Sequence, residues 1–236
     1  MLQPSPFVLS RLNERFGTAP AETVLRGVMD RFEGKIALVS SFGAEAAVLL
    51  HMVSMMDRNL PVLFLNTELL FPQTLLYQQA LAERLRLSDI RIIVPNEATD
   101  PDRKLHFRDT QACCALRKIE PLNAALNGFD AFLTGRKRFQ TQARKDLELF
   151  EADQSDRLRI NPLANWTTKQ VTNYFAVFDL PRHPLTADGY PSIGCAPCTT
   201  RVTKDEDARA GRWRSEEREE CGIHFNENGT IIRRAG

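Results

Sequence analysis

The chain has 236 residues, of which 43% are hydrophobic and 26% charged, and its formal net charge is +1. This length allows one domain with a substantial core, and the composition is that of a soluble globular protein. A nearly neutral chain has no global field that recruits nucleic acid or a membrane. We therefore expect neither partner, and local clusters of cations must bind any anion.

The N-terminal residues 1–16 lack the basic start and apolar run of a secretory signal. The most apolar stretch, residues 44–56, contains Glu45 and His51 and is too short to span a bilayer. We therefore expect a cytoplasmic protein. Cysteines in that compartment stay reduced unless they bind metal or take part in chemistry, and an odd count of five argues against a disulfide framework.

The first two thirds of the chain alternate between helical and extended patterns. This alternation predicts an α/β fold with a twisted parallel sheet and helices on both faces, in which ligands bind beyond the carboxyl ends of the strands. The predicted helices cover residues 6–16, 20–32, 44–56, 72–85 and 116–126, and the predicted strands cover residues 36–39, 62–65, 90–94 and 131–133.

The pattern weakens after Gly135. Two further strands are predicted at 147–150 and 158–160, followed by a helix at 167–178 with Thr167 as its N-cap and an irregular region at 181–198. We see no repeat and no linker, so the chain is predicted to be one domain over residues 1–236. Its nucleotide-binding core covers about residues 36–200, and a mobile C-terminal tail covers about residues 201–236.

Polar residues follow three of the predicted strands. The run Ser40-Ser41-Phe42-Gly43 leads from a strand into a helix, where backbone N–H groups and hydroxyls suit a phosphate or sulfate. Asn66-Thr67-Glu68 and Thr134-Gly135-Arg136 follow two other strands. These segments are typical of the rim of a nucleotide pocket, although a capped helix and ordinary polar strand ends would have the same pattern.

Four cysteines occur in two close pairs, Cys113 with Cys114 and Cys195 with Cys198. Two pairs indicate one metal site. Zinc sites usually take spaced pairs, whereas adjacent ligands suit a four-iron cluster, because each cysteine can bind a different iron. Separate buried cysteines, or a redox-active Cys-x-x-Cys, remain the alternatives.

The fifth cysteine, Cys221, follows Glu219 and Glu220. Neighbouring carboxylates disfavour the thiolate, so any reactivity must come from cations that the tail meets when it folds over a site. Residues 135–145 hold five cations, and a second cluster lies at residues 209–214. A small dianion is the predicted ligand of residues 135–145. The alternatives are an incidental surface thiol, a solvated basic loop at residues 135–145 and, for residues 209–214, a helix face paired with the neighbouring glutamates.

The segments 113–122, 193–199 and 220–224 resemble the sulfonucleotide reductases of assimilatory sulfate reduction, and the resemblance runs from about residue 36 to residue 224. It implies an adenine nucleotide alpha hydrolase-like fold. The double cysteine pair is similar to the form that carries a [4Fe–4S] cluster and reduces adenylyl sulfate, whereas members acting on the 3′-phosphorylated nucleotide typically lack those four cysteines. The implied cluster ligands are Cys113, Cys114, Cys195 and Cys198.

The resemblance also implies a role for other residues. Cys221 matches the nucleophile, His224 a histidine near it, and Lys118 a lysine that links cluster and substrate electrostatically. Three arginines that match those around the phosphosulfate are Arg144, Arg209 and Arg212. The residues that match the nucleotide cradle are Ser40, Ser41, Phe42, Gly43, Leu65, Thr67 and Gly135.

By this resemblance, the chain would reduce adenylyl sulfate to sulfite and AMP through a sulfonated cysteine, with reduced thioredoxin or a similar thiol donor as partner and with a possible homo-oligomeric state. Alternatives are a reductase for 3′-phosphoadenylyl sulfate or for both substrates, and a zinc-stapled nucleotide-binding module without catalysis. An ATP-dependent adenylation or thiolation enzyme is disfavoured, because Ser40-Ser41-Phe42-Gly43 lacks the Ser-Gly-Gly-x-Asp-Ser pattern.

The sequence departs from the family at two places. Asn66-Thr67-Glu68 stands in place of Asp-Thr-Gly, and a run of tryptophans is reduced to Trp213.

Overall fold

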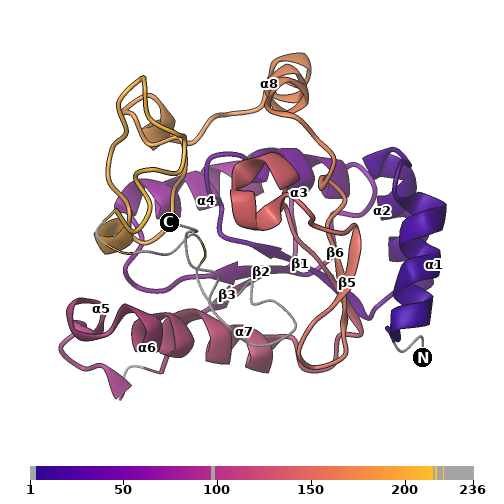
Figure 1. The fold of residues 1–236 in the computed structure, drawn as a ribbon, viewed down its shortest axis with the longest axis horizontal. Coiled ribbons are helices and arrows are strands. Elements are labelled where there is room, and N and C mark those ends of the chain that lie inside the picture. The colour runs from indigo at the N-terminus through magenta and orange to yellow at the C-terminus, as the bar shows by residue number, and fades with distance from the viewer. Residues whose placement is uncertain (1–3, 97–98, 215, 217–219, 221–236) are drawn as a thin grey trace.

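A single sheet organises the protein (Figure 1). In this computed structural model, residues 4–96, 99–214, 216 and 220 are described. Within them, the sheet has six strands in the order β3-β2-β1-β4-β6-β5. The strands are β1 (Ile36–Ser40), β2 (Val62–Leu65), β3 (Ile90–Ile93), β4 (Ala131–Leu133), β5 (Phe150–Ala152) and β6 (Leu158–Ile160).

The strand pairing confirms the predicted parallel sheet and adds one antiparallel edge. Strands β3, β2, β1, β4 and β6 are parallel to their neighbours, whereas β5 runs antiparallel to β6. The chain builds outward from β1 through β2 and β3, and then returns to place β4 on the other side of β1. This reversal creates a topological switch point at the carboxyl ends of β1 and β4, where ligands bind in sheets of this kind.

Helices cover both faces of the sheet, as predicted, with α7 on one face and α3 and α4 on the other (Figure 1). In β2, Val62 and Phe64 pack into the larger core with α3 and α4, while Leu63 and Leu65 pack with α7. The helices are α1 (Pro6–Phe16), α2 (Ala21–Arg31), α3 (Ala46–Ser54), α4 (Pro72–Leu85), α5 (Leu105–Arg108), α6 (Thr110–Cys114), α7 (Glu120–Ala125) and α8 (Thr168–Val177).

Two predicted elements differ from the structure. The helix predicted over 116–126 is α7 preceded by a π-helical turn, Ala115–Ile119, which joins it to α6. The strand predicted over 147–150 is wrong before Phe150, where β5 begins. Leu147 and Leu149 are buried, but the Leu147 N–H donates to the Arg144 carbonyl at 2.9 Å in a turn. The core therefore takes up these apolar side chains without a strand.

The sheet edge at β5 is completed by a side chain of α1. The Asn13 amide donates to the Phe150 carbonyl and accepts from the Phe150 N–H, both at 2.9 Å. This pair of bonds satisfies backbone groups on the outer side of an edge strand. Among the described residues, no helix has both the length and the apolar character needed to cross a bilayer.

Residues 201–214 of the predicted tail pack against the Cys-x-x-Cys loop. Thr199 and Arg212 form an antiparallel bridge, and the Thr200 N–H donates to the Gly211 carbonyl at 2.8 Å. A Cβ on Gly211 would lie 2.1 Å from the Thr200 carbonyl oxygen, so this approach of two backbones requires glycine. The bridge fixes the described tail beside the second cysteine pair.

Gly27 provides a test of the helix boundaries. It lies on the exposed face of α2, and a Cβ there would meet no atom within 4 Å. Gly27→Ala should raise the free energy of unfolding by about 0.5–1 kcal/mol, because alanine loses less backbone entropy in a helix. Urea denaturation measures this change.

Gly34→Ala is the matched control, since its Cβ would also meet no atom within 4 Å, but its φ is +70°. A left-handed alanine is strained, so this variant should be destabilised by about 1–2 kcal/mol. Equal shifts of the same sign in both variants would contradict the helical assignment of Gly27.

Candidate functional site

A pocket of about 620 Å³ lies at the switch point of the sheet. Its volume falls within the ~300–1,000 Å³ range of small-molecule sites. Ser40 and Gly135, which end or follow the neighbouring strands β1 and β4, both line it. The predicted substrate-binding residues that line this pocket are Ser40, Ser41, Gly43, Leu65, Thr67, Lys118, Gly135, Arg144, Arg209 and Arg212.

The loop after β1 divides its residues between the pocket and the core. Phe42 adopts a left-handed φ of 48° and is fully buried, with its ring 5.1 Å from Phe64 in an edge-on contact. Its N–H donates to the Ser40 hydroxyl at 3.1 Å. The Phe42 side chain therefore belongs to the core, while Ser41 and Gly43 on either side of it face the pocket.

The two cysteine pairs come together beside the pocket. Cys113 and Cys114 end α6, and Cys195 pairs with Leu70 in an isolated bridge after β2. Burial, followed by the Cys114 and Cys195 thiols, raises the pKa of Cys113 to about 12. Burial and Cys195 likewise raise the pKa of Cys198 to about 11, with a smaller contribution from Cys114. The four sulfurs are therefore close enough to influence one another's ionisation.

Cys195 differs from the other cysteines because it faces cations and a hydroxyl. Thr67 Oγ1 lies 3.1 Å from its Sγ. Burial acts to raise the pKa of Cys195, but Lys118, Thr67 and Arg212 outweigh it and lower the pKa. Within the described ranges, no group of three or more His, Cys, Asp or Glu side chains meets the geometry for holding a metal ion.

Lys118 belongs both to the cysteine site and to the pocket. It is buried in the π-helical turn Ala115–Ile119, lines the pocket and interacts with the Cys195 thiol. A π-turn adds one residue to a helical turn and so changes the direction of the side chains that follow. This turn gives Lys118 contact with both sites.

Arg212 presents a buried guanidinium to the pocket. It stacks 4.4 Å from the Trp213 ring centroid, and in the described part of the chain its Nε has no hydrogen-bond partner. A Cβ on Gly194 would lie 2.2 Å from one terminal nitrogen of this group. Gly194 therefore makes room for the guanidinium. An unpartnered buried donor at a pocket wall fits an anionic ligand.

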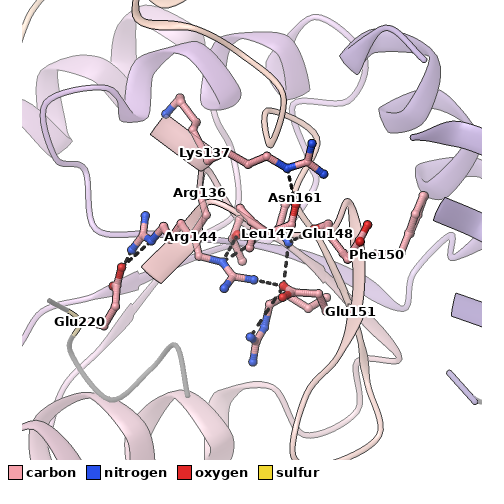
Figure 2. Close-up of polar contacts among 12 residues, drawn as sticks. Arg136, Lys137, Arg144, Leu147, Glu148, Phe150, Glu151, Asn161 and Glu220 are labelled. Carbon is pink, nitrogen blue, oxygen red and sulfur yellow. Dashed lines mark hydrogen bonds and ion pairs between the residues drawn. The ribbon is translucent and has the colours of Figure 1, made fainter. Parts of the chain in front are cut away.

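Arg144 holds a carboxylate of the tail. Its Nε and one terminal nitrogen donate to the two Glu220 oxygens, each at 2.6 Å (Figure 2). Arg209 lies 3.9 Å from the same carboxylate and 3.4 Å from the Ser192 hydroxyl. Burial acts to raise the pKa of Glu220, but Arg144, Arg209 and Arg136 outweigh it and hold this pKa below its ordinary value.

Several residues at the pocket wall were not predicted as site residues, namely Glu45, Arg136, Lys137 and Glu220. Lys137 is 1% exposed and donates to Glu45 at 3.0 Å. Burial lowers the pKa of Arg136 to about 10, with Glu151 opposing the shift, so the guanidinium stays protonated at neutral pH (Figure 2). The basic run after β4 was the available signal, but it did not reveal which cations are buried.

Cys221 and His224, the predicted nucleophile and its neighbour, lie outside the described residues. The last described residue before them is Glu220, which lines the pocket. The structure thus brings together both cysteine pairs, the loop of residues 40–43 and the three predicted arginines at one end of the sheet.

Residues 35–201 match the family model described as the phosphoadenosine phosphosulfate reductase domain. The chain belongs to this family. It is 48% identical over 211 residues to an adenosine 5′-phosphosulfate reductase of Mesorhizobium japonicum, covering 88% of this chain and 83% of the relative. A phosphoadenosine 5′-phosphosulfate reductase of Gloeobacter violaceus is 35% identical over 92% of this chain and 93% of its own.

The fold agrees with that of a solved relative. A phosphoadenylyl-sulfate reductase from Candida auris, in a phosphate complex, superimposes with a TM-score of 0.74 at 27% identity. The similarity covers 85% of this chain and 99% of that structure. The resemblance to sulfonucleotide reductases and the predicted fold class are therefore confirmed.

The structure explains how Glu68 can stand where the reductase family's Asp-Thr-Gly has its glycine. Glu68 has a φ of 60°, a left-handed conformation that glycine adopts at lower cost. Its carboxylate pairs with Arg117 at 3.4 Å and with Arg103 at 3.6 Å. Arg117 also donates to the Thr67 carbonyl at 3.0 Å. These contacts stabilise a glutamate at the strained position and keep Thr67 in the pocket wall.

Gly194→Ala tests the place of Arg212 in this reductase. The new Cβ should displace the guanidinium and weaken binding of pyrophosphate, an anionic probe, about ten- to a hundredfold, since a charge-assisted contact contributes ~1.5–3 kcal/mol. The melting temperature without ligand should change little, because the displaced group is the end of a flexible side chain. Calorimetric titration and thermal melting measure the two effects.

Arg212→Ala should weaken pyrophosphate binding to the same extent, and the double variant should bind no more weakly than either single variant. Gly27→Ala, distant from the pocket wall, is the control. If adding Gly194→Ala to Arg212→Ala weakened pyrophosphate binding further, Gly194 would affect binding independently of the Arg212 guanidinium.

Proposed function

We propose that this chain reduces adenylyl sulfate to sulfite and AMP, with Cys221 as nucleophile, a thioredoxin-like dithiol as electron donor and a [4Fe–4S] cluster on its four paired cysteines. One observation carries the proposal. The pocket at the switch point of the sheet is lined by residues of the loop 40–43, by three arginines and by a lysine that interacts with the Cys195 thiol. The names of the relatives at 48% and 47% identity support the choice of substrate.

The pocket cations prepare the substrate for attack by an anion. Adenylyl sulfate joins a sulfate to a phosphate, so a thiolate approaching its sulfur meets negative charge on both groups. Lys118, Arg209 and Arg212 line the pocket and offset this repulsion. Donors that are already in place when charge moves to the leaving phosphate stabilise the transition state without reorganisation.

In the first step the Cys221 thiolate attacks the sulfur, and the bond from sulfur to the bridging oxygen breaks. That oxygen takes the electron pair and leaves as AMP, and Cys221 retains an SO3 group. In the second step a donor thiolate attacks the Cys221 sulfur and expels sulfite. The donor's second thiol then breaks the mixed disulfide, so the dithiol is oxidised and Cys221 is restored.

The cysteine site offers four thiols in two pairs, the residue type and number that ligate an iron–sulfur cluster. The Sγ atoms of Cys113, Cys114, Cys195 and Cys198 influence one another's ionisation, and Thr67 offers a hydroxyl to Cys195. These four residues would hold the cluster. When bound, the cluster would link the two cysteine pairs covalently. It would also place a local charge beside Lys118, without redox exchange with the substrate.

The second candidate substrate is 3′-phosphoadenylyl sulfate. A relative at 35% identity and a solved relative at 27% identity carry that name. The paired cysteines favour adenylyl sulfate in this chain. Sulfite release from both nucleotides, compared as kcat/KM, decides between the two substrates.

The intermediate provides the test of the proposed function. Mixed with adenylyl sulfate and no thiol donor, the protein should release about one AMP per chain and gain about 80 Da, the mass of SO3, on Cys221. Intact-mass and fragment spectra locate the adduct, and adding reduced thioredoxin should discharge it as sulfite. Turnover by Cys221→Ser, or an adduct on a paired cysteine, would overturn the mechanism.

Iron analysis tests the cluster separately. Anaerobically purified protein should contain about four irons and acid-labile sulfide per chain. Serine substitution at Cys113, Cys114, Cys195 or Cys198 should remove the iron, whereas Cys221→Ser should keep it. Zinc in place of iron would favour a zinc-stapled module, and full iron in all four serine variants would exclude these ligands.

A further inference from the structure

Glu220 is buried in the pocket wall although it lies in the C-terminal segment. Its residue exposure is 3%, and both of its carboxylate oxygens accept from Arg144 at 2.6 Å. The Thr141 hydroxyl donates to one of them at 3.4 Å. A carboxylate that is removed from water needs this kind of bidentate, charge-assisted partner.

The site that receives Glu220 is itself held in place. The remaining terminal nitrogen of Arg144 donates to the Gln140 side-chain oxygen. The Gln140 amide donates to Glu45 at 2.8 Å, and Glu45 also accepts from Lys137. These contacts orient the Arg144 guanidinium so that its Nε and its other terminal nitrogen donate to Glu220 (Figure 2).

The pocket stays open and cationic with Glu220 in place. The pocket has a volume of about 620 Å³ with Glu220 in its wall, and Lys118, Arg209 and Arg212 also line it. An anionic substrate therefore has both space and partners without displacing Glu220. Glu220 occupies the Nε edge of Arg144 and also lies 3.9 Å from Arg209.

We infer that Glu220 is a positioning residue that anchors the tail to Arg144 and so delivers the following residue, Cys221, to the substrate. This inference rests on the proposed function. Cys221 is bonded to Glu220, and consecutive Cα atoms lie about 3.8 Å apart, so an anchored Glu220 limits how far the thiol can be from the pocket. Arg144 then acts through the tail instead of contacting the phosphosulfate.

The opposite reading makes Glu220 a competing anion that the substrate must expel from Arg144. The two readings predict changes of opposite sign. Removing an anchor slows sulfonation of Cys221 and leaves nucleotide affinity nearly unchanged. Removing a competitor tightens nucleotide binding, because Arg144 becomes available to the substrate.

Single-turnover kinetics with adenylyl sulfate distinguish these readings. Glu220→Ala and Arg144→Ala should each slow adduct formation roughly 10- to 100-fold, since a small misplacement of a reacting group costs up to about 10²-fold. The dissociation constant for AMP should change less than about threefold, and the double variant should be no slower than the single variants. Glu220→Gln keeps the shape with a weaker bond and should fall between Ala and wild type.

Alkylation of Cys221 by iodoacetamide, followed by peptide mass mapping without nucleotide, gives a readout that needs no activity. Releasing the anchor should raise the labelling rate in both Glu220→Ala and Arg144→Ala. A purely electrostatic influence on the thiol would change the two rates in opposite directions, because one variant removes an anion and the other a cation. Glu206→Gln, which changes a half-buried carboxylate paired with Arg214, is the matched control and should leave both rates unchanged.

The anchor is supported when Cys221 is alkylated faster and sulfonated more slowly in both Glu220→Ala and Arg144→Ala. The double variant should then show no further decrease in the rate of sulfonation. The anchor is overturned by opposite labelling changes, by unchanged rates, or by tighter nucleotide binding in Glu220→Ala. Iron content and melting temperature confirm that each variant is folded. Failure of the wild-type protein to release sulfite would reject the proposed function alone, since the labelling comparison stands without it.

Discussion

Two buried ion pairs at the carboxyl edge of the sheet organise the end of the molecule where the pocket lies. Lys137 pairs with Glu45 and Arg144 with Glu220, and in each pair the cation is almost fully buried. An unpaired charge at such depth is costly, so each carboxylate stabilises the buried cation that it contacts. They join the loop after β1, the basic loop after β4 and the C-terminal segment into one wall.

The sequence predicted the elements whose periodicity is local. The strands at 62–65, 131–133 and 158–160 and the helix at 72–85 have the predicted bounds, because alternation and helical spacing arise from residues near one another in the chain. The π-turn at Ala115–Ile119 and the turn at Leu147 have no such signature. Side chains from both turns contact residues distant in sequence: Leu147 packs in the larger core, and Arg117 donates to the Thr67 carbonyl.

The same limit applies to the site. Cysteine pairs, a strand–loop–helix junction and a basic run can be recognised from residue type and spacing alone, and the structure gathers them at one end of the sheet. The partners of the cations could not be recognised, because Glu45 and Glu220 lie 92 and 76 residues from the side chains they bind. Phe42 illustrates the reverse case: a residue within a polar loop whose side chain belongs to the core.

The contact between Asn13 and Phe150 has a consequence for how this protein can be shortened. A fragment limited to residues 35–201, the range of the family match, would lack α1 and leave the outer backbone groups of β5 without the Asn13 amide. An uncovered strand edge is a template for pairing with another chain. Such a fragment would retain the sequence of every strand yet expose a strand edge that Asn13 of α1 covers in this structure.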